Sequence, residues 1–343
     1  MDASNPHRQE LVVVTGASTG IGAATARELA QRGFHVLAGV RRDVDAESLR
    51  TDGIEPHILD ITVESDVVAI ADRVARDPLR RPVRALINNA GIPINAPVET
   101  LPMAEWRRLF EVNLFGHVAM TQALMPALLR STGTVVNISS VGGKVAMSTY
   151  GAYAGSKFAL EAVSDSLRRE VAQFGVKVVV IEPGAVKTEM AERGIANADR
   201  LNASMTPAQL QRYGDLTAAI SAQARSFIKT GVAAEHAANV IAKAATASRP
   251  RTRYAIGRDA AILVRLARVI SDRLLDRILR LGLRPHYVKT SQPSRGIAPM
   301  QNPPMHVPFG TCIAKTVSRS TRRRSLCGRS SATSRAGPSG RRR

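Results

Sequence analysis

The feature that most constrains the fold is a regular alternation of short apolar runs with longer amphipathic segments over the first 260 residues. The runs are rich in β-branched residues and are mostly apolar throughout, a pattern typical of parallel strands covered on both faces. Each run is followed by a segment with helical periodicity. This alternation predicts an α/β fold of the Rossmann type, a doubly wound parallel sheet of about seven strands built as one domain.

The boundaries of the expected elements can be read from the same pattern. The expected strands are Leu11–Thr15, His35–Gly39, Glu55–Leu59, Val83–Asn88, Thr134–Ile138, Val176–Ile181 and Thr252–Ile256. The main expected helices are Ile21–Arg32, Glu64–Arg76, Ala104–Leu129, Tyr153–Phe174 and Glu235–Ala247. The domain therefore spans residues 1–257. Residues 184–232, which are helix-rich and lack a strand pattern, form an insertion expected to act as a lid.

The segment after the last strand has a different pattern. Its apolar residues recur mostly every three or four positions with arginines between them, at Ile262, Leu266, Val269, Ile270, Leu274, Ile278 and Leu281. This spacing predicts one basic amphipathic helix over residues 258–285. We expect its apolar stripe (258–283) to pack beside the substrate cleft, and the alternative is peripheral contact with a membrane surface.

Positive charge is concentrated at the C-terminal end of the chain. Residues 290–343 carry eleven lysines and arginines and no acidic residue, more than half of the net charge of +20. Pro, Ser, Gly, Thr and Arg dominate this tail, so we expect it to be disordered. An abrupt loss of acidic residues would also follow from a change of reading frame, and both explanations stay open. Because so much of the charge lies in the tail, nucleic-acid binding by the main domain is not expected.

Cysteine usage and hydropathy exclude several classes of protein. Both cysteines, Cys312 and Cys327, lie in the tail, so neither a disulfide framework nor a cysteine metal site is available to the domain. The first ten residues lack an apolar signal stretch, and no uninterrupted apolar run reaches the ~18 residues needed to span a bilayer. We therefore expect a cytoplasmic protein without a metal.

A glycine-rich turn follows the first strand and opens the first helix. It comprises Thr15, Gly16, Ser18, Thr19, Gly20, Ile21 and Gly22 in the spacing GxxxGxG. Glycines at such a junction permit a tight turn, close approach of a pyrophosphate and close packing of helix on strand. A glycine turn alone could simply join two elements. Its place at the first strand–helix junction of a parallel sheet favours binding of a dinucleotide.

The end of the second strand bears on the choice of cofactor. NAD-binding versions of the fold usually place an acidic residue there, whereas a nearby arginine accommodates the 2′-phosphate of NADP. Val40 fills the acidic position and Arg41 follows it, so NADP(H) is favoured over NAD(H). Alternatively, Arg41 and Arg42 are solvated surface residues. Asp60 and Ile61, after the third strand, are expected beside the adenine, although Asp60 could instead cap the next helix.

Polar residues suited to acid–base chemistry follow the fourth and fifth strands. Tyr153 and Lys157 are four residues apart at a helix start and share one face, where the ammonium can lower the pKa of the phenol. Taken alone, this pair could arise by chance in any helix. Ser139 and Ser140, however, end the fifth strand at the sheet edge where ligands bind, and Asn113 is expected within a helix.

These motifs together resemble the short-chain dehydrogenase/reductase family over residues 8–260. The stretch Tyr153–Arg169 most resembles members acting on retinol, hydroxysteroids and similar lipophilic alcohols. The family pattern TGxxxGxG is matched at Thr15–Gly22, NNAG at Asn88–Gly91, the catalytic Asn at Asn113, and YxxxK at Tyr153–Lys157. The family spacing selects Ser140 over Ser139. Pro183-Gly184 matches the turn beside the nicotinamide.

The resemblance implies an NAD(P)-dependent enzyme that interconverts a lipophilic alcohol and a ketone or aldehyde by direct hydride transfer. Tyr153 would exchange the proton and Ser140 would hydrogen-bond the substrate oxygen. Lys157 would bind the ribose and reach Asn113 through water. Further cofactor contacts would come from Asn89, Ala90, Gly91, Pro183, Gly184, Val186 and Thr188.

The resemblance also implies a homo-oligomer, a dimer or a tetramer. Two other functions stay open. One is a catalytically silent nucleotide-binding protein of the same fold, against which the complete set Asn113, Ser140, Tyr153 and Lys157 argues. The other is nucleic-acid binding through the basic tail.

Overall fold

Seven parallel strands form the centre of the protein in a computed structural model that describes residues 10–287. The strands are β1 (Leu11–Val14), β2 (His35–Val40), β3 (Ile54–Ile58), β4 (Val83–Asn88), β5 (Thr134–Ile138), β6 (Lys177–Pro183) and β7 (Arg253–Ile256). Their order in the sheet is β3-β2-β1-β4-β5-β6-β7. The predicted doubly wound fold is thus confirmed, with strand ends shifted by at most two residues. The tail 290–343 and both cysteines lie outside the described residues.

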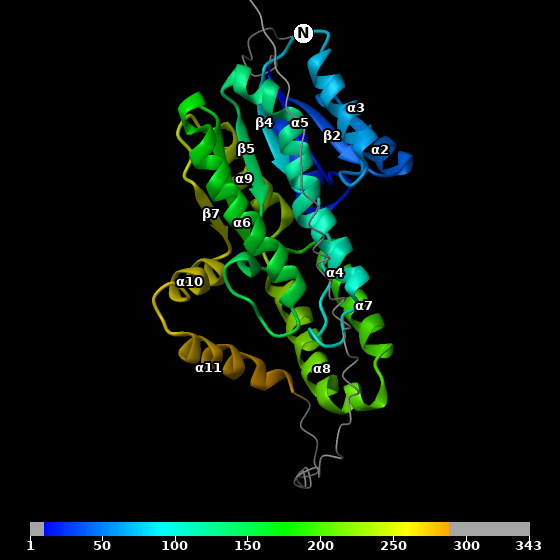
Figure 1. The fold of residues 1–343 in the computed structure, drawn as a ribbon. Helices are drawn as coiled ribbons and strands as arrows, with labels where there is room; N and C mark the ends of the chain where they lie inside the picture. The colour runs from blue at the N-terminus through cyan, green and yellow to red at the C-terminus, as the bar shows by residue number, and fades with distance from the viewer. Residues whose placement is uncertain (1–9, 288–343) are drawn as a thin grey trace, which may run out of the picture. The chain divides into compact units, whose positions relative to one another are not determined.

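Helices cover both faces of the sheet (Figure 1). The helices that flank it are α1 (Gly20–Gln31), α2 (Asp43–Leu49), α3 (Glu64–Ala75), α5 (Gly116–Ser131), α6 (Gly151–Val171) and α9 (Ala234–Thr246). On one face, α1 and α9 pack against each other and against the sheet, and on the other lie α3, α5 and α6. The crossovers run in opposite directions on either side of β1 and β4, which places a ligand crevice at the carboxyl ends of these strands.

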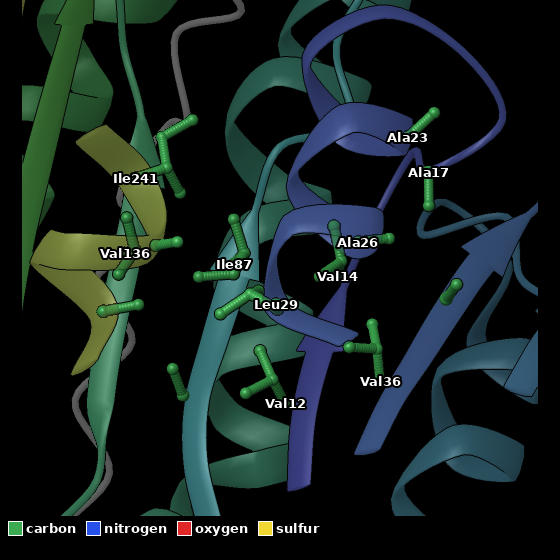
Figure 2. Packing of buried hydrophobic residues seen from close by; sticks show 14 of the residues in the cluster. Val12, Val14, Ala17, Ala23, Ala26, Leu29, Val36, Ile87, Val136 and Ile241 are labelled. Atoms are coloured by element: carbon green, nitrogen blue, oxygen red, sulfur yellow. The ribbon is translucent and has the colours of Figure 1, made fainter. Parts of the chain in front are cut away.

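Side-chain alternation along each strand separates the two cores. Val12 and Val14 of β1 point to the α1 face, where Ala26 and Leu29 meet them (Figure 2). Leu11 and Val13 of the same strand point to the opposite face. Because both faces are buried, the strand must be apolar at every position, which is the pattern that identified it in the sequence.

The long helix after β4 contains an irregularity that the sequence pattern did not predict. Instead of one α-helix over Ala104–Leu129, the chain forms α4 (Met103–Phe110), a π-helical turn η2 (Glu111–Phe115) and then α5. Asn113 lies at the centre of the π turn and is fully buried. Its side chain is held by hydrogen bonds to a neighbouring loop and to α6, and π turns occur frequently at functional sites.

By length and composition, the segment Met103–Ser131 is also the one helix in the described residues that could cross a membrane. In this fold its apolar residues have another explanation. Met120, Leu124 and Leu128 are essentially inaccessible to solvent and pack on the sheet with α3. The segment is a core helix.

The insertion contains two helices, α7 (Glu189–Ala203) and α8 (Pro207–Thr230), and no strand, as predicted. Its ends are joined where the backbone N–H of Lys187 donates to the carbonyl of Val232 (2.9 Å) and that of Val232 to Ala185 (3.0 Å). The insertion is therefore anchored at its base, immediately after the Pro183-Gly184 turn.

The prediction of one helix over residues 258–285 is wrong. The structure has α10 (Arg258–Leu266) and α11 (Asp272–Leu283), followed by the 3₁₀ turn η5 (Arg284–His286). Ser271 adopts extended backbone, and the new helix begins at Asp272, where a carboxylate in the first turn is favoured by the helix dipole. Leu283 is buried against Ala219 and Ile220 of α8, so the segment packs on the insertion.

Candidate active site

The glycine turn has the close backbone contacts expected of a phosphate cradle. Gly16 and Gly20 have positive φ angles of 63° and 57°. A Cβ at Gly16 would lie 2.7 Å from the Cα of Ala90, and one at Gly22 would lie 2.2 Å from the Gly16 oxygen. No larger residue fits at either position, so packing requires a glycine at both, and the positive φ requires one at Gly16 as well.

The segment Asn89–Gly91 holds this turn in place. The Thr15 hydroxyl accepts hydrogen bonds from the backbone N–H groups of Asn89 and Ala90, both at 3.0 Å. The Asn89 amide donates to the carbonyl oxygens of Thr15 and Gly16, also at 3.0 Å. Residues predicted separately from two motifs thus form one structural unit.

The start of α1 is suited to an anion. Its N-cap, Thr19, is extended and makes no side-chain capping bond in this structure. The first amides of a helix are donors without helical partners, and they carry partial positive charge. Ser18 and Ile21 flank this position, as expected. The turn, the uncapped helix start and the glycine cradle together fit the pyrophosphate of a dinucleotide.

Helix α7 also contacts the glycine turn. This contact could not be predicted from the sequence, because α7 is distant from the turn along the chain. Arg193 of α7 donates from Nη2 to the hydroxyl of Thr19 at 3.4 Å. Thr188, the N-cap of α7, also contacts the turn, since a Cβ at Gly20 would lie 3.1 Å from its methyl group. The insertion therefore reaches the phosphate cradle.

The two arginines after β2 have different surroundings. Arg42 binds the Asp45 carboxylate through Nε and Nη2, at 2.8 and 2.6 Å. Arg41 is exposed, and no ion pair is recorded for it among the described residues. Val40 is buried in the core and carries no charge. Arg41 is thus the cation that remains available at the position where the sequence predicts a 2′-phosphate.

Asp60 and Ile61 have structural partners at the expected adenine position. The Asp60 carboxylate accepts hydrogen bonds from the N–H and hydroxyl of Thr62, at 2.9 and 2.7 Å. It organises the turn before α3 but does not cap the helix, whose N-cap is Val63 and has no side-chain capping bond. Ile61 is buried against Gly116, where a Cβ would lie 2.6 Å from the Ile61 side chain.

The acid–base candidates come together at the carboxyl end of β5. Helix α6 begins two residues earlier than predicted, at Gly151, and carries Tyr153 and Lys157 one turn apart. Ser140 caps the short turn η3 (Val141–Gly143), and its hydroxyl accepts from the Gly142 N–H at 3.0 Å. A hydrogen bond from Ser140 lowers the pKa of Tyr153, but burial has the larger effect and raises it.

The lowering of the Tyr153 pKa expected from Lys157 is therefore not the net result in this structure. The Lys157 ammonium donates instead to the carbonyl of Ile138, at 2.8 Å. Burial lowers the pKa of Lys157 to about 8, while the Glu161 carboxylate acts in the opposite direction. Lys157 is almost fully buried, so its charge is costly unless other groups compensate it.

The Asn113 side chain makes structural hydrogen bonds to two neighbouring segments. Its Oδ1 accepts from the Ile92 N–H at 2.9 Å, and its Nδ2 donates to the Ile92 carbonyl at 3.0 Å and the Ser156 hydroxyl at 3.2 Å. These bonds fix the loop after Gly91 to α6. Ser156 was not predicted, because a serine inside YxxxK carries no signal of its own.

His117 is a second functional candidate that the sequence analysis missed. Its Nε2 lies 2.6 Å from the carbonyl of Ala90, within the segment that holds the glycine turn. Burial, with a smaller effect of the Lys157 charge, lowers the pKa of His117 to about 3. A neutral His117 therefore supports the loop beside the cofactor site, and a lone histidine in a helix gave no indication of this.

The turn after β6 completes the site. The N–H of Gly184 donates to the Ile256 carbonyl at 2.9 Å, and Pro183 ends β6. Val186 is buried and bridges to Val232, and Thr188 accepts from the Ala191 N–H at the start of α7. The expected nicotinamide contacts thus lie at the base of the insertion.

Comparison with known proteins agrees with this geometry. Residues 10–198 match the family model described as short chain dehydrogenase. The chain belongs to the short-chain dehydrogenase/reductase family. It is therefore an NAD(P)-dependent oxidoreductase with a Rossmann-type fold.

Individual relatives and structures refine the comparison. Human retinol dehydrogenase 16 is 36% identical over 264 residues, covering 75% of this chain and 83% of that protein. An NADPH-dependent 3-dehydrocapnine reductase from Ornithobacterium rhinotracheale is 31% identical over 280 residues, covering 79% and 96%. A short-chain dehydrogenase from Burkholderia cenocepacia J2315, solved with NADP, superposes with a TM-score of 0.62 at 26% identity, covering 78% and 97%. The chain thus resembles retinol dehydrogenases.

Proposed function

We propose that the protein uses NADP(H) to interconvert a lipophilic alcohol and its ketone or aldehyde, with Tyr153 as the acid–base residue. The observation that carries this proposal is the arrangement at the carboxyl end of β5. There the Ser140 hydroxyl lies close enough to Tyr153 to lower the pKa of its phenol, and Lys157 is buried one helical turn away. The glycine turn opens at the same edge of the sheet.

Three side chains of the protein, those of Tyr153, Ser140 and Lys157, each have a defined part in this reaction. A bound nicotinamide dinucleotide supplies or accepts the hydrogen and electron pair that interconvert carbonyl and alcohol. The Tyr153 hydroxyl gives its proton to the substrate oxygen in reduction and recovers it in oxidation. Ser140 donates a hydrogen bond to that oxygen. Lys157 holds the cofactor ribose, and its positive charge favours the phenolate of Tyr153 when the proton leaves.

The water link between Lys157 and Asn113 belongs to the same proposal. A Cβ at Gly91 would lie 3.3 Å from Asn113 Oδ1 and 3.9 Å from Lys157 Nζ. Both polar atoms therefore border the space beside Gly91. A water there would connect the ammonium to Asn113 and would resupply the proton of Tyr153.

The preference for NADP(H) is supported by charge. Arg41 is exposed and without a recorded ion pair at the end of β2, whereas the neighbouring Arg42 is engaged by Asp45. A guanidinium binds a phosphate well and gains little from two ribose hydroxyls. The names of the capnine reductase and the Burkholderia structure, which mention NADPH and NADP, point the same way.

The lipophilic substrate is supported by the surroundings of Tyr153. Its ring packs with an apolar cluster that includes Ile92, Ile94, Phe110 and Leu201. The retinol dehydrogenases in the comparison carry the name of a lipophilic alcohol, in keeping with such a lining. We propose retinoid-like or steroid-like alcohols and carbonyls as the substrate class.

The insertion is proposed as the lid over this substrate. Gly194 of α7 lies against Pro93, with a Cβ there 3.2 Å from the proline ring. Helix α8 packs Ile220 near Tyr150, whose ring meets Tyr153 edge-on at a centroid distance of 6.3 Å. Both helices thus contact residues next to the catalytic tyrosine.

Two further associations are proposed, a homo-oligomer and peripheral contact of α11 with an anionic membrane. Arg273, Arg277, Arg280 and Arg284 border a hollow of about 340 Å³ with Leu281. Arginines beside an exposed leucine are suited to lipid headgroups at a bilayer surface. Light scattering would give the oligomeric state. Sedimentation with phosphatidylserine vesicles, compared with neutral vesicles, would test the membrane contact.

The function itself is tested by turnover. Purified protein would be assayed with NADPH or NADH against retinaldehyde, steroid ketones and short polar ketones. We expect NADPH oxidation with the lipophilic carbonyls. Binding of NADPH without turnover of any carbonyl or alcohol would instead favour the catalytically silent alternative. Retention on DNA that is lost without residues 290–343 would favour nucleic-acid binding through the tail.

A further inference from the structure

A cluster of buried charges lies behind Lys157 and is not used in the mechanism above. Glu161 on α6 and Glu182 at the end of β6 are 4% and 2% exposed. Two cations meet them, Lys144 from the loop after η3 and Arg253 from β7. Two buried carboxylates beside two half-buried cations are costly to desolvate, and such groups are kept in some proteins for the specific arrangement that they impose.

The contacts within the cluster are centred on Glu161. Its Oε2 lies 2.8 Å from the Lys144 ammonium and 3.0 Å from both Nε and Nη2 of Arg253. Glu182 is farther from the same cations, at 4.0 Å from Lys144 and 3.4 Å from Arg253. The second oxygen of Glu161 has no hydrogen-bond partner among the described residues, and neither does the buried hydroxyl of Ser139.

This cluster connects the elements that carry the catalytic residues. Lys144 belongs to the loop that begins at Ser140, and Glu161 follows Lys157 by one turn of α6. Gly143 allows the loop and helix to approach, because a Cβ there would lie 2.5 Å from Ser139 Oγ and 3.2 Å from Glu161 Cγ. The Lys144–Glu161 ion pair thus ties the Ser140 loop to α6.

We propose that Glu161 is a positioning residue for the active site, which holds the Ser140 loop on α6 through Lys144 and keeps the Lys157 ammonium charged. The proposal rests on the proposed function only in the use made of Lys157. The geometry of the ion pairs stands independently of any substrate.

The charge balance around Lys157 supports this role. Glu161 follows Lys157 by one turn of α6, and its charge raises the pKa of Lys157, although the two side chains do not form an ion pair. The Lys157 charge also acts on His117 of α5, whose pKa is so low that it brings no positive charge near neutral pH. Tyr153 is neutral until its proton leaves. Glu161 is therefore the acidic group that opposes the effect of burial on the pKa of Lys157.

Other charged groups partly offset the negative charge of Glu161. Lys144 and Arg253 lie on it directly, and Asp165 engages Arg253 at 2.9 Å. Burial and the Glu161 charge raise the pKa of Glu182, and Lys144, Arg253 and Arg268 lower it. Removing Lys144 leaves Glu161 less neutralised and strengthens its effect on Lys157. Removing the negative charge of Glu161 should therefore lower the pKa of Lys157, and removing the positive charge of Lys144 should raise it.

The first experiment is a pH titration of the Lys157 ε-carbon by NMR in the cofactor-free protein with ¹³C-labelled lysine, assigned with Lys157→Arg. The pKa in the unmodified protein should be about 8. Glu161→Gln should lower it by about one unit, and Lys144→Met should raise it. Glu161→Asp keeps the charge and should restore most of the difference.

The matched control is Asp165→Asn, which removes another carboxylate on the same helix and the same Arg253, one turn farther from Lys157. Its titration should be unchanged. Equal titration curves for Glu161→Gln and the unmodified protein would overturn the proposal. If Glu161→Gln does not fold, a Lys144→Met variant whose Lys157 pKa fails to rise would overturn it equally.

A second measurement follows the reaction, with retinaldehyde and NADPH as the probes. The fall of kcat/KM at high pH should begin about one unit lower in Glu161→Gln than in the unmodified protein. Asp165→Asn should keep the original profile. Absence of turnover in the unmodified protein would refute the proposed function and would leave the NMR test of Glu161 intact.

Discussion

Helices α6 and α8 are similar in length but very different in how they are held. α6 buries eight of its 21 residues, among them Lys157 and Glu161, whereas α8 buries four of its 24. α6 packs on β6 and on the π turn around Asn113, and its side chains form hydrogen bonds or ion pairs with four neighbouring segments. α8 is joined to the body largely through Tyr150, Glu99 and α7.

The difference indicates that the two helices have different functions. A proton donor must stay within hydrogen-bonding distance of its substrate, so its helix is fixed by buried contacts. A substrate cover must open, and a helix with few buried apolar residues can move at small cost in free energy. The predictions below test whether function follows this difference.

The largest effect on turnover is expected from a mutation in α6. Tyr153→Phe removes the proposed proton donor while retaining the ring and its packing. We expect kcat to fall by ~10²–10⁴-fold with NADPH affinity nearly unchanged. Tyr254→Phe, which removes a hydroxyl in β7, serves as the control and should keep its activity. Full turnover by Tyr153→Phe would show that another group donates the proton.

The next largest effect concerns stability in acid. The pKa of the buried His117 is lowered to about 3, whereas an unfolded histidine has a pKa near 6.5. As pH falls below 6.5 the unfolded chain takes up a proton that the native protein refuses until about pH 3. The free energy of unfolding should therefore drop across this window by about 1.4 kcal/mol per pH unit from this residue alone.

His117→Gln should flatten this part of the pH dependence, as measured by denaturant unfolding between pH 4 and 7. The exposed His236→Gln is the matched control and should keep the original slope. An unchanged slope in His117→Gln would mean that His117 is not the group responsible for the loss of stability.

A smaller effect is expected on cofactor preference, from a mutation directly after β2. Arg41→Asp replaces attraction for a 2′-phosphate by repulsion and offers an acceptor to ribose hydroxyls. Loss of one charge-assisted pair costs ~1.5–3 kcal/mol, so kcat/KM for NADPH relative to NADH should fall at least tenfold. Arg42→Gln, already engaged by Asp45, should change the ratio much less. Equal use of both cofactors by the unmodified enzyme would refute the assignment.

The smallest effect is expected from a mutation at the contact of α8, part of the proposed lid, with Glu99. Glu99 accepts a hydrogen bond from Tyr213 of α8 at 2.7 Å and also contacts Arg212. Because these groups are exposed, Glu99→Gln should leave Tm unchanged. We expect a change of a few-fold in KM for the lipophilic substrate. Asp72→Asn, which breaks an exposed pair within α3, should change neither quantity. A large loss of Tm would mean that α8 is a fixed element.

The sequence alone determined the parts of the protein that depend on local pattern. Continuous apolar strands such as Val83–Asn88 had to lie inside a two-sided sheet, and the predicted strand matches the observed one at both ends. Gly16 and Gly22 were identified from the GxxxGxG spacing at the first strand–helix junction, and the structure shows that no larger residue fits there. Tyr153 and Lys157 were placed together by helical spacing, which needs no tertiary information.

Only the tertiary structure decided the features that depend on contacts between distant segments. The π turn at Asn113 arises where hydrogen bonds to Ile92 and Ser156 hold the side chain, and helical periodicity carries no sign of those partners. The break at Ser271 follows from the packing of α10 and α11 on different elements. The link from Arg193 to Thr19, and the Lys144–Glu161–Arg253 cluster, join residues far apart in the chain. A charged residue looks the same in sequence whether it is solvated or buried, because its free energy is set by the groups that the fold brings beside it.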